Sequence, residues 1–488
     1  MEPRTTALEL VALAALLTLA ALATRLSGRF GVPSLLFFLL LGMLARAQPW
    51  APLPPPDFRL VFRAGAMALA LILFDGGLNT SLRPARSVLG PSLLLATVGV
   101  VVTAAIVAVA AALGGLGWPT ALLLGAAVSS TDAAAVFSVL RATGARLHEK
   151  VGLTLELEGG LNDPMAVLLT FSLADALAGG RLTVGTAALT LVLQLGVGAL
   201  VGVGAGYGGR FALQHARLPS TGLYPVLTLA LAFGAFGVAT LARGSGFLAV
   251  YLTGALLGAG RLPLRANLRR VHDALAWVAQ ITMFLLLGLS IRPAALPHAL
   301  LLGSLLAAVL ALVARPLAVL LCLAPFRYRP KERLFVAFVG LRGAVPIVLA
   351  TYPLIRHIAG AQALFELVFA MVVVNSVVPG ALAGRLAQAL GLHERRPPPA
   401  PAGLEMISLQ DYDGDFVSYY VGEASAVAGA EIQELPLPAG CAVTLVVRGR
   451  ELVPPRGDTR LEVGDHVYLF TKAADRTLVD LLFGLVEE

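Results

Sequence analysis

Long apolar segments separated by short polar loops run through most of the chain. Most of these segments are close to the roughly 20 residues that an α-helix needs to cross the hydrocarbon core of a bilayer. The pattern therefore predicts an all-α polytopic membrane protein with about 13 transmembrane helices. The expected spans are residues 7–25, 30–46, 60–78, 90–113, 117–140, 150–178, 184–209, 222–242, 245–260, 271–291, 297–323, 333–355 and 362–390.

Basic residues are concentrated in alternate loops between these spans, for example at Arg261, Arg265, Arg269 and Arg270. The positive-inside rule places the richer side in the cytoplasm. With an odd number of spans, we expect an external N-terminus and a cytoplasmic C-terminal domain in a bacterial inner membrane. The first apolar segment is interpreted as an uncleaved helix, because a single Arg4 precedes it and another span follows directly.

Composition narrows the class of protein further. Hydrophobic residues make up 58% of the chain and charged residues 13%, against about 25% charged in soluble domains. The net charge of +7 has a topological explanation, so we expect no nucleic-acid partner. Cys322 and Cys441 are the two cysteines, which excludes a disulfide framework and a cysteine zinc site. We expect no cofactor in the membrane part.

The composition changes after Arg396. Residues 397–401 are rich in proline and predict a stiff linker. Residues 442–447 and 466–470 are β-type runs bounded by turn residues, and residues 478–482 suggest a terminal helix. We therefore predict a transmembrane domain over 1–392, a linker over 393–403 and a small α/β cytoplasmic domain over 404–488.

Acidic residues occur inside three of the apolar spans. A charge at the centre of a bilayer costs a few kcal/mol, so these residues indicate an ion or proton pathway. A hydrogen-bonded polar core is the alternative for one carboxylate, and it is a poor explanation for five. Pro164 can free a backbone carbonyl beside Asp163 as a further ligand. The five residues are Asp75, Asp132, Glu156, Glu158 and Asp163.

Two spans contain sequences that disfavour a continuous helix. Residues 129–132 are Ser, Ser, Thr and Asp, which bond the local backbone. Residues 341–346 combine Arg342 and Gly343 with a proline. Such breaks in two halves predict inverted repeats whose broken helices cross at the site, where Asp132 and Arg342 would balance the helix ends. We assign Glu158 as the partner of Arg342, and interpret Asp175, Arg315 and Glu366 as helix-end or inter-helix groups.

At these residues the chain resembles the monovalent cation:proton antiporter superfamily, and most of all its electroneutral Asn-Asp type. The resemblance covers about residues 1–392 and rests on four motifs in the family's order, at 74–78, 130–134, 158–164 and 341–344. It implies that Asp163 binds the cation and the proton, with Thr131 and Asp132 lining the site and Asn162 supporting it. It also implies the pair of Glu158 with Arg342.

The resemblance leaves some positions less defined. Asp75 stands where many relatives carry Glu, and Ser130 and Glu156 are further candidates for the pathway. Gly159 stands where relatives usually have Ser, so one oxygen ligand is missing and water is expected to fill the gap. This departure leaves the ion preference open.

The tail resembles the TrkA-C or RCK-C subdomain of potassium-transport regulators, on residues 422–425, 435–438, 447–448 and 455–465. The resemblance implies dimerisation, an unidentified small ligand on this domain, and a substrate preference for K+.

Together these features predict a secondary antiporter, not an enzyme, that exchanges one K+ for one H+ in cation and pH homeostasis. A Na+ or Li+ antiporter of the same fold is the alternative. A non-transporting membrane sensor and an intramembrane aspartyl protease are remote alternatives. The protease pattern Gly-x-Gly-Asp is incomplete here, because Asn162 precedes Asp163.

Overall fold

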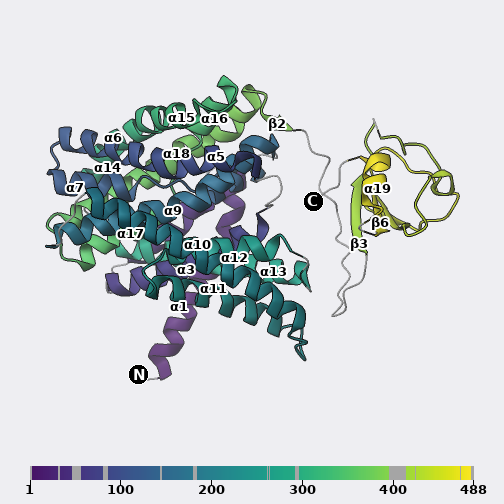
Figure 1. The fold of residues 1–488 in the computed structure, drawn as a ribbon, viewed down its shortest axis with the longest axis horizontal. Helices are drawn as coiled ribbons and strands as arrows, with labels where there is room; N and C mark the ends of the chain where they lie inside the picture. The colour runs from purple at the N-terminus through teal and green to yellow at the C-terminus, as the bar shows by residue number, and fades with distance from the viewer. Residues whose placement is uncertain are drawn as a thin grey trace. The chain divides into compact units, whose positions relative to one another are not determined.

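The structure is a computed structural model that describes residues 3–30, 33–46, 57–80, 86–142, 146–179, 184–260, 262, 264–291, 296–394, 414–423, 425–472 and 474–484. It divides into two compact units (Figure 1). The membrane unit contains nearly all of the chain up to Glu394. The C-terminal unit contains Arg395–Glu488, together with the short segments Arg217–Thr221 and Pro263–Asn267.

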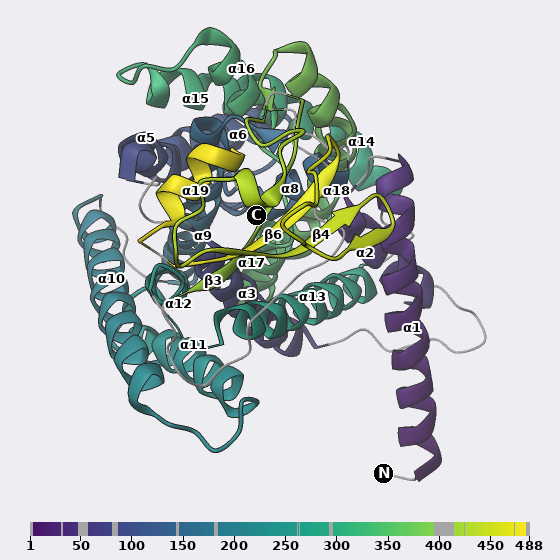
Figure 2. The same cartoon turned by 90° about the vertical axis from the view of Figure 1, so that its right-hand side faces the viewer.

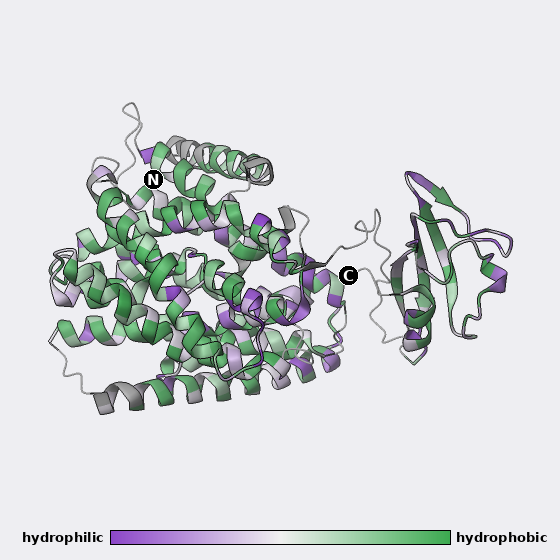
Figure 3. Ribbon diagram, turned by 90° about the horizontal axis from the view of Figure 1, so that it is seen from above, coloured by the Kyte–Doolittle hydropathy of each residue, from purple (hydrophilic) through white to green (hydrophobic). Residues whose placement is uncertain are grey.

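The membrane unit is built of helices that consist largely of hydrophobic residues (Figure 3). In chain order they are α1 (Pro3–Phe30), α2 (Ser34–Arg46), α3 (Phe58–Asn79), η1 (Arg86–Val88), α5 (Leu89–Leu94), η2 (Leu95–Gly99), α6 (Val100–Leu113), α7 (Trp118–Ala127), α8 (Ala133–Ala142), α9 (Glu149–Leu177), α10 (Val184–His215), α11 (Leu223–Leu241), α12 (Gly246–Gly258), α13 (Arg265–Ser290), α14 (Leu296–Val309), η4 (Leu310–Ala314), α15 (Arg315–Leu323), α16 (Pro330–Phe338), α17 (Val345–Ile355) and α18 (Ala361–Ala389).

Among the described residues, seven helices are long and apolar enough to cross a membrane, and five more are apolar but shorter. The 29-residue helix α9 is not one of these because it carries several charged residues, including Glu156, Glu158 and Asp163. The predicted class, a helical polytopic membrane protein with a small α/β C-terminal domain, is confirmed. The number of thirteen spans stays a prediction.

Both predicted helix breaks are present. The backbone leaves the helical conformation over residues 128–132, between α7 and α8, and again over 339–344, between α16 and α17. The two breaks lie against each other, because the backbone N–H of Asp132 donates to the carbonyl of Leu341 at 2.8 Å. Each break therefore supplies a partner for backbone groups that the interrupted helices leave unpaired.

Glycine lets some of these helices approach closely. A Cβ atom added to Gly42 of α2 would lie 3.0 Å from the Cα atom of Gly288 of α13. Without side chains at these two positions, the backbones can pack directly, as is common between membrane helices.

A two-residue antiparallel ladder connects the end of the membrane unit to the start of α9. Strand β1 (Arg146–Leu147) pairs with β2 (His393–Glu394), and the N–H of His148 donates to the carbonyl of Leu392 at 3.0 Å. The side chains of Leu147 and Leu392 are both buried in the main hydrophobic core. We call this ladder the β1–β2 clasp.

Within its described residues, the C-terminal unit is an antiparallel sheet with one α-helix and the short 3-10 helix η5 (Ile432–Glu434). Its strands are β3 (Asp415–Tyr420), β4 (Ala442–Arg448), β5 (Glu451–Val453) and β6 (Asp465–Thr471), in the spatial order β3-β6-β4-β5. The helix α19 (Arg476–Phe483) packs beside this sheet (Figure 2), and Val479 and Phe483 complete its core. The hydroxyl of Tyr419 donates to Asp480 Oδ1 at 2.7 Å, which joins β3 to α19.

Candidate ion-binding site

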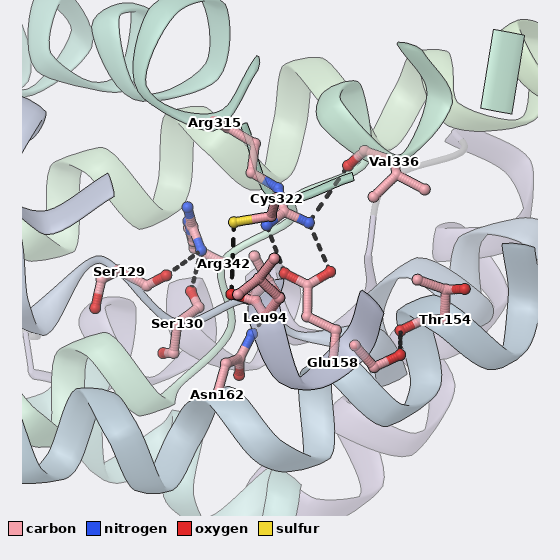
Figure 4. Close-up of polar contacts among 12 residues, drawn as sticks. Leu94, Ser129, Ser130, Thr154, Glu158, Asn162, Arg315, Cys322, Val336 and Arg342 are labelled. Atoms are coloured by element: carbon pink, nitrogen blue, oxygen red, sulfur yellow. Dashed lines mark hydrogen bonds and ion pairs between the residues drawn. The ribbon is translucent and has the colours of Figure 1, made fainter. Parts of the chain in front are cut away.

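Arg342 sits at the point where the two breaks cross, and 1% of its surface is exposed. Its Nη1 atom donates to the carbonyls of Ser129, at 3.0 Å, and Ser130 (Figure 4). The Ser376 hydroxyl of α18 donates to the carbonyl of Arg342 at 2.8 Å. The guanidinium thus places a positive charge beside carbonyls that follow the C-terminus of α7, where the helix dipole is negative.

Asp132 occupies the start of α8. Its Oδ1 atom accepts a hydrogen bond from the N–H of Ala135 at 3.0 Å, in the manner of a helix N-cap. Gly343 from the other break lies against the same carboxylate, because an added Cβ at Gly343 would overlap Asp132 Oδ2. The glycine predicted as part of the second break therefore has a steric function at the crossing.

Asp163 approaches this crossing from the middle of α9, and its side chain is buried with 7% exposure. Its charged neighbours are Asp132 and Arg342, and the Ser130 hydroxyl lies beside its carboxyl group. On the same helix, Asn162 Nδ2 donates to Thr131 Oγ1 at 2.5 Å. The structure thus brings together the five residues Ser130, Thr131, Asp132, Asn162 and Asp163.

Two oxygen atoms in this group lack hydrogen-bond partners. Ser130 Oγ and Asn162 Oδ1 are buried and have no partner of ordinary geometry within the described part of the chain. An unpaired buried oxygen costs free energy, so native structures rarely keep one without a use. Carboxylate, amide and hydroxyl oxygens are ligands for hard cations, so the donor set is chemically suited to a dehydrated alkali ion.

The prediction that Glu158 forms an ion pair with Arg342 is wrong, because a different arginine binds Glu158. Glu158 instead accepts two hydrogen bonds from Arg315 of α15, Nη1 to Oε1 at 2.5 Å and Nη2 to Oε2 at 2.8 Å (Figure 4). Both side chains are almost fully buried. Arg342 is attracted by the charges of Glu158 and Asp163, but its hydrogen bonds go to the carbonyls of the first break.

The reason for this arrangement is helical geometry. Glu158 and Asp163 are five residues apart on α9, which turns them roughly 140° away from each other. Asp163 therefore faces the crossing while Glu158 faces α15. Arg315 is the only charged residue of the apolar stretch 297–323, and this isolation is the one sequence signal for its role, which we interpret from the sequence as that of a helix-end or inter-helix group.

Glu156 and Asp75 interact with other helices. The Glu156 carboxyl group lies beside the Thr80 side chain, whose Oγ1 donates to the carbonyl of Gly76 at 2.8 Å and is 3.3 Å from the hydroxyl of Tyr251 on α12. Asp75 accepts a hydrogen bond from Asn79 at 3.1 Å and has Arg269 and Asp273 of α13 as charged neighbours. The neighbours of these two carboxylates thus belong to α3, α12 and α13, and not to the two helix breaks.

The space beside Gly159 is filled by protein. A Cβ atom added to Gly159 would lie 2.6 Å from Ala133 Cβ and 3.1 Å from Ala133 N. The Ala133 methyl group thus lies where a side chain at position 159 would begin, and the expectation that water replaces the missing oxygen ligand stays a prediction. Sequence reasoning missed Ala133 because an alanine in an apolar helix carries no signal of its own.

The chain is similar to known families over both of its parts. The model of the family described as "Sodium/hydrogen exchanger, transmembrane" matches residues 13–389, and that of the TrkA-C domain matches residues 416–484. A K(+)/H(+) antiporter NhaP of Alkalimonas amylolytica is 39% identical over 472 residues, covering 96% of this chain and 82% of that protein. A K(+)/H(+) antiporter NhaP2 of Shewanella oneidensis is 40% identical over 482 residues, covering 97% and 83%.

The fold is also similar to a solved structure. The sodium proton antiporter MjNhaP1 from Methanocaldococcus jannaschii at pH 8 aligns with a TM-score of 0.66 and 23% identity, over 79% of this chain and 99% of that one.

Proposed function

Because this chain belongs to the sodium/hydrogen exchanger family, we infer that it is a secondary antiporter that exchanges K+ for H+ across the membrane. It is a transporter and not an enzyme. The choice of K+ is supported by the K+/H+ antiporters at 39% and 40% identity and by the TrkA-C domain, which we take to regulate transport by binding a small ligand.

We assign the exchange itself to Asp163. The observation that supports this assignment is a buried carboxylate beside the unpaired oxygens of Ser130 and Asn162, where two broken helices cross. Asp163 holds either a proton or one dehydrated K+. The site can switch its access from one side of the membrane to the other only when one of these two ions is bound. Thr131 and Asp132 line the site, and Arg342 holds the carbonyls of the first break in place.

Exchange of one K+ for one H+ moves no net charge. The driving force is then the difference between the two chemical gradients, and one pH unit is worth about 1.36 kcal/mol. The neutral Asn162 next to Asp163 supports this stoichiometry, because a second carboxylate at position 162 would add another titratable charge.

We assign the membrane domain to residues 1–392 extended by strand β2 (His393–Glu394), the linker to the rest of 393–403 and the regulatory domain to 404–488. This division is supported by the compact unit that ends at Glu394 and by the TrkA-C match over 416–484. We place the protein in a bacterial inner membrane, with the N-terminus outside and the TrkA-C domain in the cytoplasm, on the distribution of basic residues between the loops.

We further propose a homodimer that uses the outer face of α10. In the most apolar part of Leu189–His215, 17% of the residues are buried within the protomer, against 33% to 67% in the corresponding parts of the other six long apolar helices among the described residues. Large side chains such as Leu200, Tyr207 and Phe211 are exposed along it. Such a face is suited to pack against a second copy within the bilayer.

The function is tested in everted membrane vesicles with a fluorescent pH dye. Addition of K+ should release protons from the vesicles and restore the dye's fluorescence, measured over roughly pH 6.5 to 9. An equal response to Na+ would instead identify an unselective antiporter. No response to any alkali cation, with the protein verified in the membrane, would contradict exchange.

Asp163→Asn is the decisive variant in this assay. The amide keeps the shape of the side chain but can neither take up a proton nor neutralise a cation, so the variant should fold and exchange nothing. Exchange at the wild-type rate would reject Asp163 as the binding carboxylate.

A further inference from the structure

Three aromatic rings meet near the start of α3 and the ends of α9 and α17. The rings of Phe171 and Tyr352 are stacked with centroids 4.1 Å apart, and the ring of Phe62 lies 5.9 Å from each of them. Such distances are typical of attractive aromatic pairs. We call these three residues the aromatic cluster. It joins α3 to α9, which carries Asp163, and to α17, which follows the second break.

An exposed ion pair lies beside the aromatic cluster. Asp175 Oδ1 accepts a hydrogen bond from the Tyr352 hydroxyl at 2.9 Å and lies 3.1 Å from Arg356 Nε. The Asp175 side chain is 51% exposed and that of Arg356 is 42% exposed. Residues 356–360 contain one arginine, whereas residues 327–333, at the other end of the same predicted span, contain four basic residues. The positive-inside rule then places the cluster just below the external surface.

Thr170 lies between the aromatic cluster and Asp163. It follows Asp163 by seven residues on α9, so it occupies the same face of the helix about 10 Å nearer to the external end. Its side chain is fully buried, and its Oγ1 atom has no hydrogen-bond partner within the described ranges. Other buried threonines of the helices, such as Thr228 and Thr253, donate to a carbonyl of the preceding turn. The Thr170 hydroxyl is therefore available to a ligand that is not part of the protein.

Helix α3 is attached more firmly to α12 than to α17. A Cβ atom added to Gly77 of α3 would lie 2.9 Å from the backbone N of Ala255 in α12, so these two backbones are in direct contact. Toward α17, α3 meets side-chain ends, because a Cβ atom added to Gly65 would lie 2.9 Å from Val348 Cγ2. The aromatic cluster thus closes the seam between α3 and the helices of the crossing.

We propose that the aromatic cluster is the outer gate of the Asp163 site, and that the Thr170 hydroxyl is a ligand for the cation between this gate and Asp163. The gate is closed in this structure, because its rings are in contact. Separating Phe62 from the other two rings breaks no side-chain hydrogen bond, since a phenylalanine ring forms none of its own. This inference rests on the proposed function, because it assumes that K+ reaches Asp163 from outside.

The gate is tested by labelling a cysteine placed below it. In a chain with Cys322→Ala and Cys441→Ser, Thr170→Cys provides a single thiol. A membrane-impermeant maleimide is added to the external side of right-side-out vesicles, and the rate of labelling is measured. The further change Phe62→Ala should raise this rate about tenfold, because it removes both aromatic contacts that hold α3 to the other two helices.

Phe236→Ala is the matched control. Phe236 of α11 and Phe247 of α12 also form an aromatic pair between two helices, with centroids 5.1 Å apart, but neither helix contains a residue of the crossing. This variant should be labelled at the rate of its parent, and equal rates for Phe62→Ala and Phe236→Ala would overturn the gate. Val167→Cys, about one turn below Thr170, is a second reporter that must show the same difference.

A pair of variants at Thr170 tests the ligand without any added cysteine. Thr170→Val keeps the shape of the side chain and removes the hydroxyl, whereas Thr170→Ser keeps the hydroxyl. With K+ supplied from the external side, Thr170→Val should raise the half-saturating K+ concentration about fivefold, the effect of one lost polar contact, and Thr170→Ser should stay near the wild-type value. The same concentration for both variants would overturn the role of Thr170.

The labelling rates do not depend on transport, so failure of the gate and failure of the proposed function are distinguishable. A protein that exchanges K+ for H+ but is labelled equally in Phe62→Ala and Phe236→Ala would contradict the gate alone. A protein that responds to no alkali cation would contradict the exchange.

Discussion

Glu158 and Asp163 show how two carboxylates on one helix acquire different functions. Glu158 is buried and held by two hydrogen bonds from Arg315. A buried carboxylate fixed in this way is neutralised within the protein and has no oxygen left to exchange. Asp163 is equally buried but lies beside unpaired oxygens. Arg342 is its charged neighbour but hydrogen-bonds the carbonyls of the first break, so we propose that the charge of Asp163 is available to a mobile ion, as a transport site needs.

Arg315→Ala should destabilise the membrane unit, because it leaves the charge of Glu158 buried without its partner. The expected loss is about 3–5 kcal/mol, measured as a lower midpoint of thermal unfolding in detergent by size-exclusion fluorescence. The double variant Glu158→Gln with Arg315→Met is the control, since it removes both charges. It should unfold at a higher temperature than Arg315→Ala. Equal midpoints for wild type and Arg315→Ala would contradict the structural importance of the pair.

The site residues differ in how far the sequence could predict them. Asp163, Asp132 and Arg342 were found because charged groups stand out in apolar segments. The partner of Glu158 could not be predicted in this way. Arg315 and Arg342 on different segments were both candidates, and a sequence does not show which helices lie close together. The filling of the space at Gly159 by Ala133 depends on how α8 packs against α9, which also lies outside local sequence patterns.

At the scale of elements, the two helix breaks were predictable because their causes are local. Ser129, Ser130, Thr131 and Asp132 compete with helical hydrogen bonds wherever they occur together. The β1–β2 clasp was not predicted, because a ladder of two residues on each strand leaves no periodic pattern. The sequence placed residues 393–394 in the linker, whereas they form strand β2 in the structure.

Truncation should reveal the importance of the clasp. A chain that ends after Glu394 keeps β2, and we expect it to exchange K+ for H+ in vesicles. A chain that ends after Gly391 loses β2 and the bond from His148 to Leu392. It should unfold at a lower temperature, because Leu147 loses the cover of Leu392 in the core. Identical unfolding midpoints would show that the clasp contributes nothing to stability.

The hydrogen bond between Tyr419 and Asp480 predicts a pH effect in the TrkA-C domain. Burial, and then the hydrogen bond to Asp480, raise the pKa of Tyr419 above its ordinary value. The folded domain therefore holds the phenol proton more tightly than the unfolded one, so this stability is present below about pH 10 and decreases as the pH rises beyond it.

Limited proteolysis of the full-length protein can measure this effect. Cleavage within residues 414–484 should accelerate above about pH 10, the ordinary pKa of tyrosine. Tyr419→Phe should be cleaved faster near neutral pH and should show a smaller further increase at high pH. The same steep increase in Tyr419→Phe would assign the effect to another group.

At the scale of the whole molecule, a helical transport unit is joined to a small sheet domain through residues 395–413. Hydrophobicity, basic loops and the change in composition after Arg396 were sufficient to predict this division. The helical unit contains the complete crossing of the two breaks, so the proposed ion site uses no residue of the C-terminal strands.

One-for-one exchange predicts that the membrane potential has no effect on the rate. Moving one net charge would be worth about 2.3 kcal/mol per 100 mV, whereas exchange of K+ for H+ moves none. Proteoliposomes given a potential with the permeant anion thiocyanate should acidify or alkalinise at the same rate as those without it. A rate that changes with the sign of the potential would require unequal numbers of ions.

The β1–β2 clasp also defines where the protein can be recombined with others. Glu394 is the last residue of the ladder, and β1 leads within two residues into the first turn of α9, the helix that carries Asp163. A foreign sensor domain grafted after Glu394 would inherit this mechanical connection to the transport helix. A graft placed at the end of α18 would lack this connection. Comparing chimaeras joined at the two positions would therefore show whether a sensor domain controls transport through the ladder or is only tethered to the protein.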